Sequence, residues 1–358
     1  MIIDRKELLE PMEKVVAISG RKATLPVLAN VLVELGKEGG KVTATDLSTT
    51  AIARINYKAE EAATFLVHGD AFHRLLKELD PGDIEISLNG TIEVKQHNAR
   101  FTVAPQDPEG FPEVARTEDT GQSATIPAST LRRILDRTAY AVSHDESRLP
   151  LSGLCLECRD GVLTAVGTDG VRLALQKEAL DAKDVHRVVI PRQALQDLRA
   201  LLAKDGQVLV KRLQKQLLFI GQDMTVATSL LDMGFPDYEA ILATKNKNII
   251  SVGREAFLKG LRKVMTIASR EAVSLTVRAE ELVLYVETEI GKARETISAT
   301  FTGKGEIEGH FQPKYLFDLF SRIPDDTVLI EAPETYGQYL FKGLNSPEYL
   351  TVLMPIKM

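Results

Sequence analysis

The fold of this chain is decided by a hairpin-like stretch near its middle, LCLECRDGVLTAV, which runs from Leu154 to Val166. Two runs of strand-forming residues flank Asp160-Gly161, a pair that favours a tight turn between antiparallel strands. The pattern occurs twice more: Val31–Leu35 and Lys41–Thr45 flank Gly39-Gly40, and Leu275–Val277 and Leu282–Val286 flank Glu280-Glu281. The sequence therefore predicts the same antiparallel hairpin three times.

A helix is predicted before and after each hairpin, because apolar residues recur there at spacings of three and four. The faces of the leading helices are Leu8, Met12, Val15 and Val16; Leu131, Ile134, Leu135, Thr138 and Val142; and Phe257, Leu261, Val264, Met265 and Ala268. The faces of the following helices are Phe72, Leu75, Leu76 and Leu79; Leu195, Leu198, Leu201 and Leu202; and Leu316, Leu319, Phe320 and Ile323. Leu8, Leu131 and Phe257 begin these faces 123 and then 126 residues apart.

These spacings indicate three repeats of one unit, and further strand-like runs close each unit. We place the domains at residues 1–121, 122–244 and 245–358. So much antiparallel strand in each unit argues against a helical solenoid. It predicts α+β domains side by side, each with sheet on one face and two helices on the other.

The composition excludes several classes of protein. The chain has 358 residues, of which 44% are hydrophobic and 26% charged, as in ordinary globular proteins. Its apolar runs are too short to cross a bilayer and it does not open like a signal peptide, so we expect a cytoplasmic location and no membrane partner. We interpret Cys155 and Cys158 as small strand residues on opposite faces, rather than as a redox pair or zinc site.

Charge is distributed unevenly along the chain. The net charge is −6, but helices of the second and third units carry an excess of positive charge that those of the first unit lack. One interpretation is that the helices face a polyanion such as duplex DNA, whose phosphates are bound without reading the sequence. The other is that these are ordinary solvated helix faces. The helix residues expected to contact DNA are Arg132, Arg133, Arg137, Arg192, Arg199, Lys259, Arg262 and Lys263.

The sequence lacks the common catalytic motifs. There is no Walker loop, G-x-G-x-x-G, G-x-S-x-G or H-E-x-x-H, and the six histidines are scattered. Asp46 and Asp169 recur after equivalent strands, so they are either metal-binding carboxylates of a nuclease or hydrolase, or turn residues bonding the local backbone. We favour the turn, because one active site seldom needs copies. The sequence predicts no catalytic residue, no metal and no cofactor.

Several ordered segments resemble the bacterial DNA polymerase III beta subunit family of sliding clamps over the full length of the chain. They are Thr24–Leu32, Ala44–Leu47, Thr168–Ala174, Gly234–Tyr238 and Met354–Met358. The resemblance implies a head-to-tail homodimeric ring of six clamp domains, with helices inside and sheets outside. Its function would be to encircle duplex DNA and to act as processivity factor for the replicative polymerase, in the cytoplasm at the nucleoid. A repeat scaffold unrelated to DNA remains the alternative.

The resemblance also assigns residues. It places Phe101 and Val103 of one chain against Met265 and Ile267 of the other. The pocket that takes short linear peptides of the polymerase, the clamp loader and repair proteins would be lined by Leu151, Thr168, Gly170, Val171, Arg172, Leu173, Pro236, Ile241, Val352, Met354, Pro355 and Ile356. Loop residues expected at DNA are Arg21, Lys22 and Arg148. The chain departs from the family at Val171, which is often His, at Ala240, which is often Arg, and at Leu149-Pro150, where some members have aromatic DNA contacts.

Overall fold

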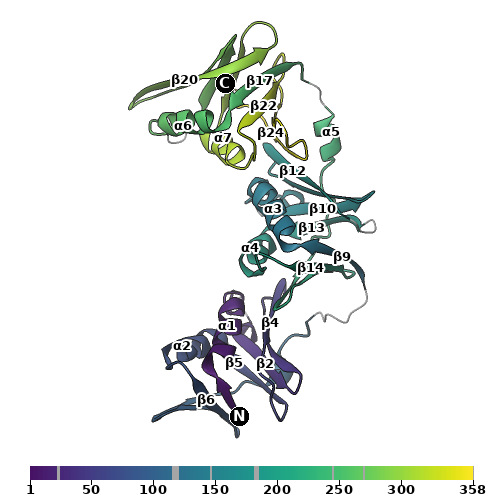
Figure 1. Cartoon of the computed structure of the whole chain (residues 1–358), viewed down its shortest axis with the longest axis vertical. Coiled ribbons are helices and arrows are strands. Elements are labelled where there is room, and N and C mark those ends of the chain that lie inside the picture. The colour runs from purple at the N-terminus through teal and green to yellow at the C-terminus, as the bar shows by residue number, and fades with distance from the viewer. Residues whose placement is uncertain are drawn as a thin grey trace. The chain divides into compact units, whose positions relative to one another are not determined.

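The computed structural model of the chain describes residues 1–21, 25–114, 121–145, 147–180, 185–243, 246–268 and 271–357. Two compact units are present: Met1–Ser129 with Gln196–Leu230, and Thr130–Leu195 with Leu231–Met358. Figure 1 labels their elements. The predicted domain boundary at 244/245 and the predicted DNA residue Lys22 lie outside the described residues.

The first unit contains two antiparallel sheets and their helices. Its elements are β1 (Ile2–Asp4), α1 (Arg5–Val15), η1 (Pro26–Ala29), β2 (Asn30–Gly36), β3 (Gly39–Thr45), β4 (Thr49–Ile55), β5 (Ala63–His68), α2 (Gly69–Glu78), β6 (Asp83–Leu88), β7 (Ile92–Gln96), β8 (Ala99–Val103), η2 (Pro108–Gly110), β9 (Gln122–Pro127), β14 (Gln207–Arg212), β15 (Gln216–Ile220) and β16 (Met224–Ser229). Four strands are ordered β1-β6-β7-β8, and eight are ordered β5-β2-β3-β4-β16-β15-β14-β9.

The second unit is built on one twelve-stranded sheet, ordered β13-β10-β11-β12-β24-β23-β22-β17-β20-β19-β18-β21. Its elements are η3 (Ala139–Ala141), η4 (Leu149–Leu151), β10 (Gly153–Arg159), β11 (Val162–Thr168), β12 (Arg172–Ala179), β13 (Val185–Pro191), α5 (Tyr238–Leu242), β17 (Asn248–Gly253), α6 (Arg254–Val264), β18 (Val273–Arg278), β19 (Glu281–Thr288), β20 (Gly291–Thr302), β21 (Ile307–Phe311), α7 (Pro313–Phe320), β22 (Thr327–Ala332), β23 (Tyr339–Gly343) and β24 (Tyr349–Leu353). Helices α3 (Ala128–Thr138) and α4 (Arg192–Leu201) have residues in both units.

The three predicted hairpins are confirmed, with two corrections to their turns. In the middle hairpin Arg159 pairs with Val162, so Asp160-Gly161 forms the turn as predicted. In the first hairpin Gly36 pairs with Gly39, so the turn comes earlier than predicted, and Gly39 closes it with a φ of 122° that favours glycine. In the third, Arg278 pairs with Glu281, so the turn is Ala279-Glu280 and Glu281 already belongs to the strand.

Each large sheet joins strands that are distant in sequence. β4 pairs with β16 in the first unit, and β12 pairs with β24 in the second, with Leu173 opposite Val352. Strands of the predicted middle domain are therefore divided between two sheets. This pairing satisfies backbone groups that a sheet edge would leave open.

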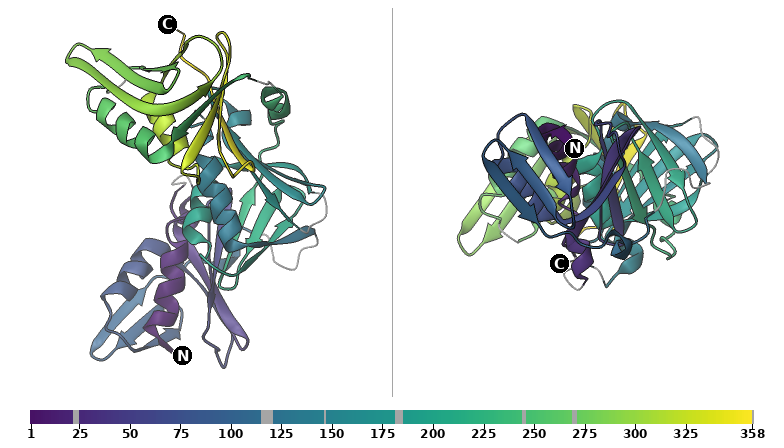
Figure 2. Two further views of the ribbon diagram at one scale, coloured as in Figure 1. Left: turned by 45° about the horizontal axis from the view of Figure 1, so that its top comes forward. Right: turned by 90° about the horizontal axis from the view of Figure 1, so that it is seen from below.

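Most residues of the predicted helix faces are confirmed as core, while Val16, Leu75, Leu201 and Met265 are only partly buried. α1 packs on β4, β3 and α2, while α6 packs on β20, β19, β17 and α7 (Figures 1 and 2). Leu8, Met12 and Val15 are buried on α1, and Phe257 of α6 stacks on Phe320 of α7 with ring centroids 3.7 Å apart. Because the apolar stripe of each helix meets the sheet, the polar side chains remain on its outer side.

Candidate partner-peptide pocket and DNA-facing helices

Part of the predicted pocket is a compact apolar cluster in the second unit. We call this set the apolar cluster: Cys155, Val166, Leu173, Leu175, Val189, Phe235, Tyr238 and Val352, with Leu231, Ile241, Leu242, Leu340 and Leu350 packed against it. Three predicted residues, Leu173, Ile241 and Val352, meet here from β12, α5 and β24. The second group is only half-buried, so apolar surface remains within reach of a partner.

Sequence reasoning missed four half-buried leucines of this cluster, Leu231, Leu242, Leu340 and Leu350. Leu242 directly follows Ile241, which was predicted, so the sequence did offer a reason to include Leu242 as well. Leu340 and Leu350 lie on β23 and β24, which pair with one another at Lys342 and Leu350. The alternation of apolar and polar residues around Leu340 and Leu350 predicts strands, but it does not show which residues pack against those strands.

The turn before β12 carries four predicted residues. The Thr168 hydroxyl donates to the carbonyl of Arg172 at 2.7 Å, and the amide of Gly170 donates back to Thr168 Oγ1 at 3.1 Å. Gly170 has a φ of 88°, a conformation that other residues rarely adopt. Leu151 Cδ1 lies 3.6 Å from the point that a Cβ on Gly170 would occupy. The turn leaves Val171 exposed.

Asp169 forms this turn, and Asp46 forms the equivalent turn of the first repeat, as favoured from the sequence. Asp169 Oδ1 accepts the amides of Val171 at 3.0 Å and Arg172 at 2.9 Å. Asp46 Oδ1 accepts the amides two and three residues onward in the same way, at 2.9 and 2.7 Å. Both carboxylates are thus engaged by their own backbone, which is the structural role of an Asx turn.

Arg172 is buried rather than displayed. Its side chain is 7% exposed and pairs with Asp169 and with Asp318 of α7, each at 3.0 Å. It also donates to the carbonyl of Tyr140 at 2.8 Å, and its guanidinium lies 4.2 Å from the ring centroid of Tyr315. With every face engaged, Arg172 joins β12 to α7 instead of lining an open pocket.

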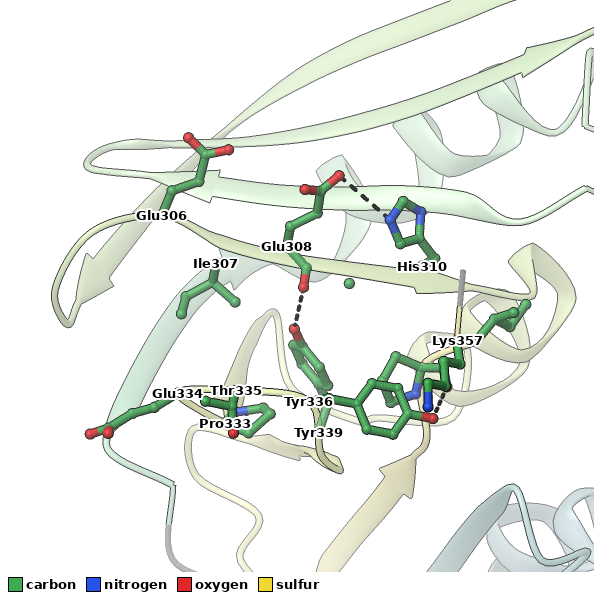
Figure 3. Close-up of a pocket in the computed structure, with 13 residues that line it drawn as sticks. Glu306, Ile307, Glu308, His310, Pro333, Glu334, Thr335, Tyr336, Tyr339 and Lys357 are labelled. Carbon is green, nitrogen blue, oxygen red and sulfur yellow. Dashed lines mark hydrogen bonds and ion pairs between the residues drawn. The ribbon is translucent and has the colours of Figure 1, made fainter.

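The C-terminal tail contributes the remaining predicted residues. The amide of Met354 donates to the carbonyl of Val171 at 2.9 Å, which places Met354 beside the turn. Pro355 and Ile356 instead line a cavity of about 340 Å³ with Tyr336, Tyr339 and residues of β21 (Figure 3). Tyr336 donates to the carbonyl of Pro355 there at 3.1 Å. The tail therefore runs between the apolar cluster and this cavity.

Pro236 lies at the entry to α5. Asp237 caps the helix by accepting the amides of Glu239 and Ala240, and Phe235 packs edge-on against Tyr238. Ala240, at the position where the family often has arginine, is exposed on α5. This short helix carries Ile241 and Leu242 to the apolar cluster.

The predicted DNA contacts differ in exposure and in their ion pairs within the protein. Lys259, Arg262 and Arg199 are exposed, on α6 and α4. Lys263, also on α6, pairs with Glu295 at 2.6 Å. Arg148, beside η4, is over half exposed and lies 3.7 Å from Asp145.

Other predicted DNA contacts are engaged within the protein. Arg133 forms a two-pronged ion pair with Glu178 at 2.7 Å, which raises the pKa of the guanidinium. Arg137 donates to Gln176 at 2.9 Å. Arg132 and Arg192 are partly buried.

Arg21 binds a buried carboxylate. Its two terminal nitrogens donate to the oxygens of Asp197, both at 2.8 Å, and it lies 3.7 Å from Asp46. The hydrogen bond to Asp197 raises the pKa of Arg21. Aligning Leu195 with Leu316 places Asp197 of α4 opposite Asp318 of α7, so Arg21 with Asp46 and Arg172 with Asp169 form equivalent junctions.

The predicted dimer contacts lie on two separate surfaces. Phe101 and Val103 belong to β8, which closes one end of the four-stranded sheet, and Phe101 is 38% exposed. Met265 and Ile267 follow α6 and are only partly buried against the core of the second unit. Both surfaces therefore offer apolar side chains to a partner.

Neither cysteine belongs to a reactive or metal-binding group. Cys155 and Cys158 are free and buried in β10, and burial raises the pKa of the Cys155 thiol to about 12. Among the described residues, no three His, Cys, Asp or Glu side chains are grouped as a metal site. Within the same part of the chain, no helix is long and apolar enough to cross a membrane.

These features define a repeat protein that works through binding surfaces. Family models of the DNA polymerase III beta subunit match its N-terminal domain at residues 1–115, its central domain at 125–237 and its C-terminal domain at 239–357. The chain belongs to this family of sliding clamps, which are non-catalytic subunits of DNA polymerase III. The fold is accordingly that of three clamp domains, and the alternative of a metal-dependent hydrolase is wrong.

Similar proteins cover the whole chain. The beta sliding clamp of Pseudomonas aeruginosa is 28% identical over 369 residues, covering 99% of each chain. A crystal structure of the DNA polymerase III subunit beta from that organism is 26% identical with a TM-score of 0.93, covering 100% of this chain and 99% of that one. The clamp of that species bound to griselimycin is 27% identical with a TM-score of 0.92, at the same coverage.

Proposed function

We propose that two copies of this chain close into a head-to-tail ring that encircles duplex DNA and tethers the replicative polymerase. The clamp loader and repair proteins would bind the same ring through short linear peptides, in the cytoplasm at the nucleoid. The observation that carries the proposal is the apolar cluster, where three distant elements place half-buried leucine and isoleucine side chains beside an exposed turn. Such a surface suits the apolar anchors of a peptide.

Encirclement is tested by the shape of the DNA. The protein is loaded on nicked circular DNA with a clamp loader, the circle is cut once, and retained protein is measured by gel filtration. We expect retention on the circle and loss after the cut, because a ring slides off a free end. Retention that is unchanged after cutting would contradict encirclement.

The pocket is tested with griselimycin as the probe, since related clamps bind it. We expect the double substitution Met354→Ala and Ile356→Ala to weaken binding about tenfold or more in calorimetry, because it removes Met354 from beside the turn and truncates the tail that follows it. Gel filtration should still give a dimer. Unchanged affinity would remove the tail from the pocket.

DNA contact on this proposal depends mainly on the second and third repeats. Lys259 and Arg262 on α6 are exposed cations of the third repeat, whereas Arg21 and Arg133 already neutralise carboxylates. Weak contacts to phosphates alone hold DNA without fixing its sequence. This division of charge allows the ring to slide.

A further inference from the structure

Helix α5 is attached to neighbouring strands by a side-chain group that joins Tyr238 of the apolar cluster to Glu157 and Arg187, which lie outside it. The Tyr238 hydroxyl donates a hydrogen bond to Glu157 of β10. Arg187 of β13 pairs with Glu157 at 2.9 Å, and its guanidinium lies 5.1 Å from the centroid of the Tyr238 ring. Tyr238 is 4% exposed, so the first residue of α5 is fixed in both position and orientation.

The strand paired with β10 is shaped at this contact. From Leu156 to Cys158 β10 advances two residues while β13 advances three, from Val188 to Val185, so the extra residue of the bulge lies in β13, opposite Glu157. A bulge changes the direction in which a side chain leaves the sheet. Here the bulged strand carries Arg187, the residue that pairs with Glu157.

The protonation states of Tyr238 and Glu157 favour the hydrogen bond between them. Burial raises the pKa of Tyr238, so its hydroxyl keeps its proton. Burial also favours the neutral form of Glu157, but hydrogen bonds from Arg187 and Tyr238 outweigh it, and the pKa of Glu157 lies below its ordinary value. Donor and acceptor are therefore matched around neutral pH.

The other end of α5 is held by further hydrogen bonds. The Gln338 side-chain amide donates to the carbonyl of Ile241. Asn246, four residues after the helix, donates to the carbonyls of Gln338 at 3.0 Å and Glu331 at 3.1 Å. The segment held in this way contains Ile241 and Leu242, which pack on the apolar cluster.

We propose that Tyr238, Glu157 and Arg187 form a latch that positions α5, and through it Ile241, as one wall of the partner-peptide pocket. The inference rests on the proposed function, because it assumes that the apolar cluster is the pocket. A five-residue helix has too few internal hydrogen bonds to hold its own orientation. Affinity depends on such a wall being in place before the peptide arrives.

The test is Tyr238→Phe, which removes one oxygen and keeps the ring against Phe235 and Arg187. We expect the Kd for griselimycin to rise about tenfold, the size of one lost hydrogen bond to a charged acceptor. Tyr285→Phe is the matched control, because Tyr285 donates to Glu287 at 2.6 Å on β19. That variant should bind within about twofold of the unchanged protein.

A double-mutant cycle with Ile241→Ala distinguishes a latch that acts through Ile241 from a Tyr238 hydroxyl that only stabilises the fold. If the latch acts through Ile241, Tyr238→Phe should change the Kd less than about twofold once that side chain is gone. Hydrogen exchange in Tyr238→Phe should rise in α5 and stay unchanged in β10. Glu157→Gln, which still accepts from the hydroxyl, should retain most of the affinity.

The outcomes distinguish the latch from the pocket. Wild-type affinity in Tyr238→Phe, or independent effects in the cycle, would overturn the latch while leaving the pocket intact. If neither Ile241→Ala nor the Met354 and Ile356 double variant weakens griselimycin binding, the pocket itself is overturned, and the latch with it.

Discussion

Replacing Arg172 by alanine removes the side chain that joins β12 to α7. Its guanidinium holds Asp169 and Asp318 at 3.0 Å each and lies between the rings of Tyr140 and Tyr315, 5.2 and 4.2 Å from their centroids. The side chain is 7% exposed, so water does not take the place of these contacts. The substitution therefore leaves carboxylates without their main counter-charge.

The cost follows from what each carboxylate keeps. Removing one partner of a buried pair costs about 3–5 kcal/mol. Asp169 retains two backbone amides and Asp318 retains Arg322 at 3.6 Å, which argues for the lower end of that range. The lost contacts with the two rings add about 1 kcal/mol. We expect the free energy of unfolding of the second unit to fall by about 3–4 kcal/mol.

The measurement is urea unfolding followed by circular dichroism, with hydrogen exchange in β12 and α7 identifying the transition. Arg278→Ala is the control, because Arg278 pairs with Glu306 while both side chains are largely exposed. An exposed pair contributes little to stability because water screens it, so the control should unfold almost as the unchanged protein does. Arg172→Lys should lie between, since lysine keeps the charge but not the planar fork. A loss below about 1 kcal/mol for Arg172→Ala would refute the reasoning.

Three further predictions use the same geometry. Replacing Lys259 and Arg262 by alanine should lower the slope of log K for DNA against log salt by about 2 in a titration on nicked circles; an unchanged slope would remove α6 from the DNA surface. Phe101→Ala should shift the protein toward monomer in sedimentation at micromolar concentration, and a wild-type dimer would exclude β8 as the interface. Because its pKa is raised to about 12, the Cys155 thiol should resist alkylation at pH 8 in the native protein and react in urea; native labelling would show an open β10.

Local chemistry is the part of this protein that could be predicted best. The helix faces depend on spacings within a few residues, and Leu8, Leu131 and Phe257 are all buried as their spacings predicted. The Asp46 and Asp169 turns depend on amides two and three residues away. Rules based on turn residues have a limit, which the two misplaced hairpin turns show. The position of a turn follows from the register in which the two strands pair, and glycine need not lie at its centre.

The charges were the least predictable part. A sequence shows that Arg21, Arg133 and Arg172 are cationic, but not whether they face solvent or a carboxylate. Arg21 reaches Asp197 across 176 positions and Arg172 reaches Asp318 across 146. Because an ion pair depends on distance in space, only the assembled sheets could decide which cations remain available to DNA.

The same distinction applies to the candidate pocket. The sequence by itself determined three copies of one αβ unit, since periodicity and turn chemistry act over a few residues and repeat with the chain. Tertiary structure alone decided that Leu173, Ile241 and Leu340 meet, that Pro355 lines a separate cavity, and that Tyr238 ties α5 to Glu157 of β10. The physical reason is that each of these contacts joins elements brought together only by the pairing of β12 with β24 and by packing on that sheet.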